Sequence, residues 1–302
     1  VAEWEQRPTF FELSLALAMK YFAERACELV ILETGMGGRL DATTAVPADV
    51  AVLTPIALDH QQWLGETLGE IAAEKASIIV PMKKVFSSPQ LPEARTIIEQ
   101  VASERRAPLE FVEDPLHGYA LGLAGEHQHG NAALALAALH SVGITLSYET
   151  VKAGLGSTSW PGRFERLDSG PGAIASGLVL DIAHNPAAAA ALAANWVREF
   201  GECKANLIFG VVESKDITGI LEALLPIADR VHFVPVNSPR ALPPAELAAL
   251  LPASSPPVEI HQNLQSAFDV PAALPTLVTG SAFLVGEVKA LLDDSSHRPS
   301  TQ

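Results

Sequence analysis

Two side chains with the chemistry of metal ligands follow apolar segments in the first quarter of the sequence. Glu33 comes directly after residues 29–32, which we expect to form a short buried strand, and His60 follows a second apolar run, residues 50–55. In open parallel sheets, ligands bind at the carboxyl ends of strands, so both side chains are expected at one sheet edge. Mg²⁺ prefers oxygen ligands but accepts one imidazole when phosphate and water fill its other positions. The pair therefore suggests a magnesium site beside a phosphate group.

Each of these residues also has a structural interpretation. A carboxylate that closes a strand can accept backbone N–H groups of the next loop, and a single histidine beside Asp59 is most often a satisfied structural group. Lys75, in "AAEKASII", resembles an ordinary surface lysine paired with Glu70 or Glu74. Carbamylation by CO₂ would instead turn its amine into a carboxylate that ligates metal. The spacing leaves both interpretations open.

The segment after Glu33, "TGMGGRLDATT", is rich in glycine. Gly35, Gly37 and Gly38 do not form the G-x-G-x-x-G fingerprint of dinucleotide-binding proteins, and no helical pattern begins there. Glycines do allow another molecule to approach the backbone closely. We therefore expect a loop that wraps a substrate.

A second group of polar residues lies in the middle of the chain. Arg163, in "WPGRFERL", is either an exposed turn residue or a phosphate clamp, since the guanidinium fork suits phosphate oxygens. In "LVLDIAHNPAAAAAL", Asn185 and Pro186 form a good helix start, which is the structural interpretation. Asp181 and His184 precede that start at the end of an expected strand. We favour a functional interpretation, in which Asp181 binds a ribose or a phosphate-bound water.

Strands and helices alternate along the chain, which predicts parallel sheets covered on both faces. The expected strands are residues 29–32, 50–55, 84–87, 178–182, 206–211, 230–234 and 276–279. The expected helices are residues 9–26, 66–79, 92–104, 131–140, 148–155, 187–200, 217–227, 244–251 and 281–292. A stretch rich in Gly, Ser and Pro, residues 154–177, interrupts the alternation. We predict α/β domains at 1–165 and 168–294, with a disordered tail at 295–302.

The composition excludes several classes of partner. The chain has 302 residues, of which 48% are hydrophobic and 18% charged, and its net charge is −15. Nucleic acid and anionic membranes are therefore poor partners. The sequence contains no run as long as a membrane span, and we expect neither a membrane segment nor a signal peptide. Cys27 and Cys203 have no metal-ligand spacing, and we expect two reduced core thiols in a cytoplasmic protein.

Seven segments occur in an order that has a known counterpart: "TFFE", "LETGMGGRLDATT", "LDHQQWLGETLGEIAAEKASII", "GEHQHGNAALALAAL", "PGRF", "LDIAHNP" and "GVVESKD". As a set they closely resemble the bifunctional dihydrofolate synthase/folylpolyglutamate synthase family of Mur-type ATP-dependent amide ligases. The resemblance implies a P-loop-type parallel-sheet ATPase domain, here truncated, followed by a smaller Rossmann-like α/β domain. It also implies ATP-dependent addition of L-glutamate to dihydropteroate or folate through an acyl phosphate. Closure of the two domains would keep water from that intermediate.

The resemblance also assigns roles to individual residues. Glu33 and His60 match ligands of the catalytic Mg²⁺ ions, and Lys75 matches a carbamylated lysine that serves the second ion. The ATP-binding positions are Asn131, Arg163 and Asp181. The segments that line the pterin site are Thr9, Phe10, Phe11 and Glu12, together with Leu40, Asp41 and Ala42. Lys75 and His184 are the expected catalytic residues. Contacts with glutamate or ATP are expected near His184, Ser214, Lys215 and Ser281.

Three departures from the family pattern leave alternatives open. The phosphate loop G-x-x-x-x-G-K-[ST] does not occur in the sequence, and we expect it to precede residue 1. "DATT" replaces "DATN" and "EKAS" replaces "EKAG", and the extension "DSGPGAIASG" should lengthen a hairpin. The alternatives are a peptidoglycan-precursor or cyanophycin-type ligase of the same superfamily and an incomplete remnant that binds folate or acts as a scaffold. We expect a monomer with small-molecule substrates.

Overall fold

The computed structural model describes residues 7–168, 177–212 and 216–293. Its described residues form two compact units. The first comprises residues 7–114 and 133–145, and the second comprises 115–132, 146–168, 177–212 and 216–293. The expected domain boundary near residue 165 stays a prediction. The two units are defined by compactness alone, and they group residues 115–132 and 146–165 with the second half of the chain.

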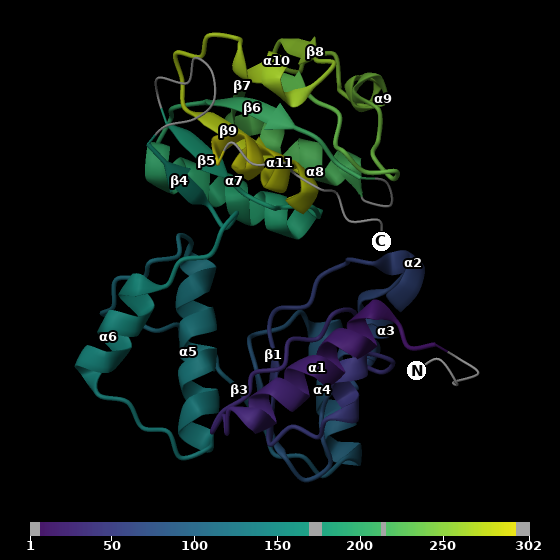
Figure 1. Ribbon diagram of the computed structural model, residues 1–302, viewed down its shortest axis with the longest axis vertical. Helices are drawn as coiled ribbons and strands as arrows, with labels where there is room; N and C mark the ends of the chain where they lie inside the picture. The colour runs from purple at the N-terminus through teal and green to yellow at the C-terminus, as the bar shows by residue number, and fades with distance from the viewer. Residues whose placement is uncertain (1–6, 169–176, 213–215, 294–302) are drawn as a thin grey trace. The chain divides into compact units, whose positions relative to one another are not determined.

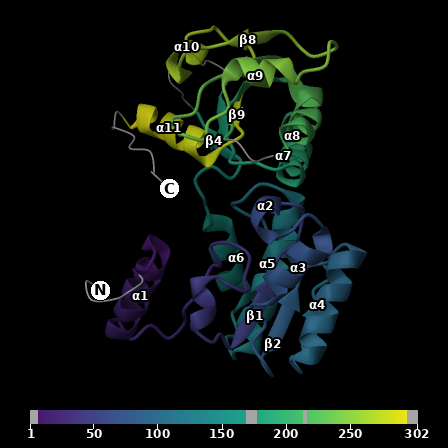
Figure 2. The same cartoon turned by 90° about the vertical axis from the view of Figure 1, so that its right-hand side faces the viewer.

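The first unit is built on a three-stranded parallel sheet in the order β1-β2-β3. Its strands are β1 (Val50–Leu53), β2 (Lys84–Ser87) and β3 (Leu109–Phe111), and Ala51 pairs with Val85 in the register. Helices α3 (Leu68–Ala76) and α4 (Pro92–Glu104) pack against each other on one face of this sheet (Figure 2). Ile71 and Ile98 are fully buried between these helices and the sheet, so this layer forms the core of the unit.

Shorter elements complete the first unit. They are helix α1 (Phe10–Glu24), the 3₁₀ turn η1 (Ala42–Ala45), helix α2 (Gln61–Leu64) and the C-terminal part of α5 (Glu126–Ser141). Helix α1 begins with a capping box, in which the Thr9 hydroxyl accepts the N–H of Glu12 and the Glu12 carboxylate accepts the N–H of Thr9. None of the residues of α1, all of which the structure describes, is buried.

The expected strand at residues 29–32 is wrong. These residues form no strand, and Ile31 is 84% exposed. An apolar run becomes a strand only by hydrogen bonding to a neighbouring strand. Among the described residues β1 pairs with β2 alone, so residues 29–32 lack such a neighbour. The expectation that Cys27 lies in the core is also wrong, because this residue is exposed. Both cysteines are free thiols.

The second unit contains a six-stranded sheet in the order β4-β5-β9-β6-β7-β8. The strands are β4 (Glu165–Leu167), β5 (Leu178–Leu180), β6 (Ala205–Phe209), β7 (Ala228–Phe233), β8 (Val258–Ile260) and β9 (Thr276–Thr279). All pairs are parallel except β4 with β5, which run antiparallel with Leu167 opposite Leu178. The predicted α/β class with parallel sheets is therefore confirmed.

Helices cover both faces of this sheet (Figure 1). On one face, α7 (Pro186–Phe200), α8 (Ile217–Leu224) and α9 (Pro244–Ala249) bury side chains such as Trp196 against Leu207 and Phe209. On the other face, α10 (Leu264–Phe268) and α11 (Ala282–Leu292) pack against Ile208. Successive strand residues alternate between the two cores, as the pleat of a strand requires. Helix α6 (Tyr148–Ser157) and the 3₁₀ turn η2 (Leu225–Ile227) complete the unit.

Among the described helices, none is long and apolar enough to cross a membrane.

Candidate active site

Asp41 organises the loop that follows Glu33. One of its carboxylate oxygens accepts the N–H groups of Gly35 and Met36 at 2.9 and 3.0 Å, and the other accepts the N–H and hydroxyl of Thr43 at 3.0 and 2.6 Å. Burial raises the pKa of the Asp41 carboxyl, but these hydrogen bonds more than offset it, so the pKa lies below its usual value. Asp41, which the resemblance places in the pterin-lining segment, thus holds the shape of this loop.

The two segments expected to line the pterin site lie next to each other in the first unit. A Cβ atom on Gly35 would lie 3.0 Å from the ring of Phe11 and 3.2 Å from the carboxylate of Asp41. A larger residue at position 35 would therefore have to displace Phe11 or Asp41 where α1 meets the loop. Phe10 and Leu40, one from each segment, are 71% and 81% exposed. The structure thus brings both segments together and leaves apolar side chains beside them in contact with solvent.

The same loop packs against helix α3, which contains Lys75. A Cβ on Gly38 would lie 2.5 Å from the backbone oxygen of Glu74 and 3.1 Å from that of Lys75. Arg39 donates from its side chain to the carboxylate of Glu74 at 2.8 Å. Glu33, just before the loop, is exposed. The loop therefore connects the segment of Glu33 to the helix of Lys75.

The two carboxylates expected to form an ion pair with Lys75, if it were an ordinary surface lysine, have other partners. Glu74 pairs with Arg39, and Glu70 accepts the N–H groups of Glu66 and Thr67 at the start of α3. The Lys75 side chain is half-buried, and no described residue pairs with its Nζ atom. The ordinary interpretation of Lys75 as one half of a surface ion pair is therefore not realised among the described residues.

His60 has an unusual backbone conformation. Its φ is 52°, in the left-handed region, at the residue before α2. For a non-glycine residue this conformation is strained, and such strain is concentrated at functional sites. Asp59 accepts the N–H of His60 at 2.8 Å, which holds this turn in place. A Cβ on Gly37 would lie 2.8 Å from Leu64 of α2, so the loop after Glu33 also packs against the helix that His60 begins.

The donor set of Glu33, His60 and Lys75 fits a hard divalent ion only in part. A carboxylate and an imidazole suit such an ion, whereas an amine does so only after conversion to a carbamate. Among the described residues, Glu33, Asp59 and His60 do not form a group of three ligands within 4.8 Å of one another. A metal ion that has two protein ligands and takes its other ligands from phosphate oxygens and water does not require a group of three.

In the second unit, Asp181 fixes the turn that contains Arg163. Its carboxylate accepts the N–H of Phe164 and the N–H of Ala183, each at 2.8 Å. The backbone oxygen of Gly162 also accepts the N–H of Ile182 at 2.9 Å. Burial raises the pKa of Asp181 above its usual value, although its two N–H donors and the nearby Arg163 act in the opposite direction. The structure therefore places Arg163 beside Asp181.

Asn131 lies on the same face of α5 as His127, whose ring is close enough to Arg163 to be affected by its charge. Burial lowers the pKa of His127, and the positive charges of Arg163 and Arg198 lower it further. His127 and Asn131 are four residues apart on α5 and so share one face of that helix. Asn131 donates from its amide to the side chain of Gln128 at 3.0 Å. The three residues expected to bind ATP therefore belong to neighbouring segments of the second unit.

The remaining predicted residues have mainly structural contacts. His184 shares a hydrogen bond between its Nδ1 and the backbone oxygen of Ile182, at 2.9 Å. Because a carbonyl only accepts, Nδ1 has the proton, and in the neutral ring Nε2 has the lone pair. Ser281 is buried at the start of α11 and accepts the N–H of Phe283. Strand β9 lies beside β5, so Ser281 and His184 follow neighbouring strands. Ser214 and Lys215 lie outside the described residues.

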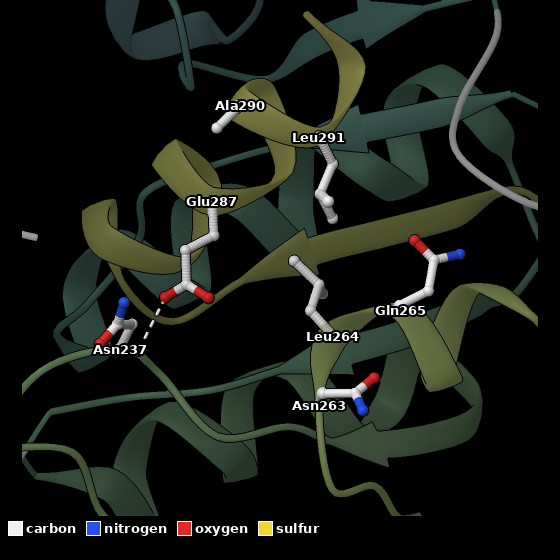
Figure 3. Close-up of a pocket in the computed structure, with 7 residues that line it drawn as sticks. All are labelled: Asn237, Asn263, Leu264, Gln265, Glu287, Ala290 and Leu291. Atoms are coloured by element: carbon white, nitrogen blue, oxygen red, sulfur yellow. Dashed lines mark hydrogen bonds between the residues drawn. The ribbon is translucent and has the colours of Figure 1, made fainter. Parts of the chain in front are cut away.

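A separate pocket of about 290 Å³ lies between α10 and α11 (Figure 3). In Figure 3 the carboxylate of Glu287 points toward Asn237, whose backbone N–H it accepts at 2.7 Å. Leu264, Ala290 and Leu291 form its apolar lining. None of the predicted site residues that the structure describes lines this pocket, so it is distinct from the candidate active site.

Comparison with known proteins places this arrangement in a family. Residues 162–283 match the family model of the Mur ligase, glutamate ligase domain. The chain is 35% identical over 300 residues to the dihydrofolate synthase/folylpolyglutamate synthase of Mycobacterium tuberculosis, covering 87% of this chain and 61% of that protein. It is 33% identical over 308 residues to the protein of the same name from Escherichia coli, covering 94% of this chain and 70% of that protein. The chain belongs to the dihydrofolate synthase/folylpolyglutamate synthase family.

A solved structure from this family has the same fold. The bifunctional folylpolyglutamate synthase/dihydrofolate synthase of Yersinia pestis, complexed with AMPPNP and a Mn ion, superposes with a TM-score of 0.83 and is 31% identical. The match covers 96% of this chain and 72% of that chain. The predicted family and fold class are thus confirmed, while the chain spans about 61% of the Mycobacterium relative.

Sequence reasoning missed several residues that shape the candidate site. Arg39 holds Glu74, Glu165 accepts the N–H of Gly162, and His127 lies near Arg163. The position of Asp41 just before "ATT" is a signal that could have been used, because an aspartate commonly caps a following turn. The other contacts join residues distant in the sequence and leave no local signal.

Proposed function

We propose that the protein is an ATP-dependent ligase that joins L-glutamate to the carboxylate of dihydropteroate or a folate. The observation that carries this proposal is the packing of one loop, residues 35–41. This loop contacts Phe11 of the expected pterin segment, Leu64 of the helix that His60 begins, and the backbone of Glu74 and Lys75. Segments assigned to the acid and to the metal ion therefore meet at a single glycine-rich loop, and the names of the relatives support the substrate class.

The chemistry follows from the poor reactivity of a carboxylate. An oxygen of the carboxylate attacks the γ-phosphorus of ATP, the bond from that phosphorus to the bridging oxygen breaks, and ADP leaves. The amine of glutamate then attacks the acyl carbon of the resulting acyl phosphate. An amide forms, inorganic phosphate leaves, and the amine gives up a proton.

Glu33 and His60, with Lys75 as a carbamate, would hold the divalent ion, which supplies neutralisation of charge on the phosphate oxygens. Asp41 keeps the loop that follows Glu33 in one shape, and Arg39 joins this loop to Glu74 of the helix that contains Lys75. We assign Phe10 and Leu40 to the pterin ring because both are apolar and exposed beside that loop. The ring of Phe10 can stack on a flat heterocycle, and Leu40 can pack against it.

The nucleotide is assigned to the second unit. Arg163 offers a guanidinium for phosphate oxygens, and Asp181 fixes the turn that presents it. Asn131 lies on the face of α5 that is near Arg163. The match of residues 162–283 to a glutamate ligase domain supports assignment of glutamate to this unit, where His184 and Ser281 follow neighbouring strands.

The experiment that tests the proposal measures ADP formation with Mg²⁺, ATP and L-glutamate. Dihydropteroate or folate should stimulate ADP formation, and product mass should rise by one glutamyl unit for each ADP. A UDP-sugar peptide in place of the folate substrate should give no stimulation. Stimulation by the peptide would instead establish a peptidoglycan-type ligase, and folate binding without ADP formation would establish a binding module.

We further propose that the protein is a cytoplasmic monomer without a nucleic-acid partner. The net charge of −15 supports the last point, since phosphate backbones and the protein repel each other. Light scattering at two protein concentrations tests the oligomeric state, and a mass twice that of the chain would contradict it.

A further inference from the structure

Three side chains of the second unit form a cluster at β7 and β8, toward the opposite edge of the six-stranded sheet from β5 and Asp181. His232 lies on β7, Glu259 lies opposite it on β8, and His261 follows the end of β8. The Nδ1 atom of His232 lies 2.8 Å from Nε2 of His261, and Oε2 of Glu259 lies 4.0 and 3.9 Å from these two atoms. Among the described residues this is a group whose three ligand atoms all lie within 4.8 Å of one another.

The triangle formed by these three atoms has the size of a metal coordination shell. A point equidistant from all three lies about 2.1 Å from each, which is the usual distance from Zn²⁺ to imidazole nitrogen and carboxylate oxygen. Tetrahedral coordination would place the two nitrogens about 3.3 Å apart, so an ion would open the histidine pair by about half an ångström.

The contact of His232 with Asn206, on the side of the ring away from the cluster, determines which ring nitrogen has the proton. Its Nε2 lies 2.8 Å from Oδ1 of Asn206, inside the sheet, and the amide of Asn206 in turn donates to the hydroxyl of Thr276. Because Oδ1 only accepts, Nε2 of His232 has the proton, and the lone pair of the neutral ring lies on Nδ1. A histidine that ligates a metal commonly donates its other N–H to a fixed oxygen in this way.

The carboxylate of the cluster is also held in place. Arg230 donates to Oε1 of Glu259, which leaves Oε2 toward the histidines. The side chain of His232 is fully buried, that of His261 is 9% exposed and that of Glu259 is 36% exposed. The one charge that opposes a cation among these contacts is Arg230.

We infer that His232, Glu259 and His261 form a binding site for a divalent transition-metal ion of the Zn²⁺ type. Two imidazoles and a carboxylate suit Zn²⁺ and Co²⁺ better than Mg²⁺. Water reaches the fourth position from the exposed side of Glu259. The site is separate from the magnesium site proposed at Glu33 and His60, which belong to the other unit. An ion here would join β7 to β8 and to the segment that follows β8.

The test uses the full chain after treatment with a chelator. Zn²⁺ is titrated in competition with a chromophoric chelator, and Co²⁺ is added separately to record its visible absorption spectrum. The variants are His261→Ala and Glu259→Gln, both at partly exposed positions. The matched control is His117→Ala, which removes an exposed imidazole of the same unit outside the cluster. Glu33→Gln serves to separate this site from the proposed magnesium site.

We expect His261→Ala and Glu259→Gln each to weaken Zn²⁺ binding at least tenfold and to abolish a tetrahedral Co²⁺ spectrum, whereas His117→Ala and Glu33→Gln retain both. Zn²⁺ should also raise the melting temperature of the wild type but not that of His261→Ala, because binding to the folded state stabilises it. Equal Zn²⁺ affinity in the wild type and His261→Ala overturns the proposal, and so does a wild type that binds no Zn²⁺. The pair would then be a neutral hydrogen bond between the histidines. An unfolded His261→Ala would be recognised by circular dichroism, and Glu259→Gln then decides the question.

Discussion

The carboxylate of Asp181 accepts the backbone N–H of Phe164 at 2.8 Å, across seventeen positions of the sequence. Phe164 has a φ of 47°, in the left-handed region that non-glycine residues rarely adopt. Such a conformation costs on the order of 1–3 kcal/mol and persists only where its surroundings hold it. Asp181 supplies that support and thereby fixes the backbone next to Arg163.

Replacing Asp181 by asparagine should weaken binding of an ATP analogue by about tenfold or more. An asparagine has one acceptor oxygen, so its amide nitrogen must face one of the two N–H groups that Asp181 now accepts, which costs about 1–3 kcal/mol. Isothermal titration calorimetry measures the change. The control is Asp168→Asn, which changes an exposed aspartate four residues after Phe164. Equal weakening in both variants would show that the effect is not due to this turn.

Replacing Lys75 by alanine should abolish ADP formation, and acetate should restore part of it. The reason is that a small carboxylate can occupy the place of the carbamate that we propose on Lys75. Lys83→Ala, which removes an exposed lysine paired with Asp49, should leave the rate unchanged. If acetate gave no recovery and intact peptides showed only unmodified Lys75, carbamylation would be excluded.

Glu33→Gln and His60→Ala should each remove turnover while the free energy of unfolding changes by less than about 0.5–1 kcal/mol. Both side chains are exposed, and exposed substitutions have small effects on stability. Steady-state ADP formation and urea unfolding provide the two measurements. Glu28→Gln and His117→Ala are the matched exposed controls. A variant of Glu33 or His60 with a near-native rate would contradict the proposed metal site.

Asp41→Ala should lower the free energy of unfolding by about 2–3 kcal/mol at pH 7, because four hydrogen bonds to a charged carboxylate are lost. The pKa of Asp41 is lowered on folding, so its contribution is complete above the unfolded value of 3.8 and is lost as the pH falls through the lower folded value. The difference between wild type and variant should therefore shrink below about pH 4.

Urea unfolding at pH 7 and at about pH 3 measures this difference. Asp49→Ala, which removes an exposed ion pair, should change the free energy of unfolding at pH 7 much less than Asp41→Ala does. A difference for Asp41→Ala that stayed constant on acidification would show that the carboxylate charge is not what holds the loop.

Elements with strong local signals could be predicted from the sequence. Strand β2 and helix α4 begin and end at the expected residues, because Pro92 fixes the start of the helix and a short apolar run precedes it. Strands β3, β4 and β8 were not predicted, because each has only three residues, none of them buried, and a charged residue at its first or middle position. Strand β5 is equally short, but its three residues are all apolar and buried, and it was predicted. Residues 29–32 were apolar enough to predict a strand, but pairing with a neighbour decides that outcome.

The candidate site was predictable as a set of segments but not as a set of contacts. The order of Glu33, His60 and Lys75 in known motifs identified the family, which the comparisons confirm. The pairing of Arg39 with Glu74 joins residues thirty-five positions apart, and no local pattern indicates it. The same holds for His232, which meets Glu259 only because β7 and β8 pair in one particular register.

The way the chain passes through helix α5 limits how the protein can be cut. The backbone leaves the first unit after residue 114, returns to it at residue 133 within α5, and leaves again after residue 145. A single proteolytic nick or a single truncation point therefore cannot release either unit intact. Chimaeras made with a relative must exchange two separate stretches of gene, because an exchange at one junction alone would assemble at least one unit from two parents.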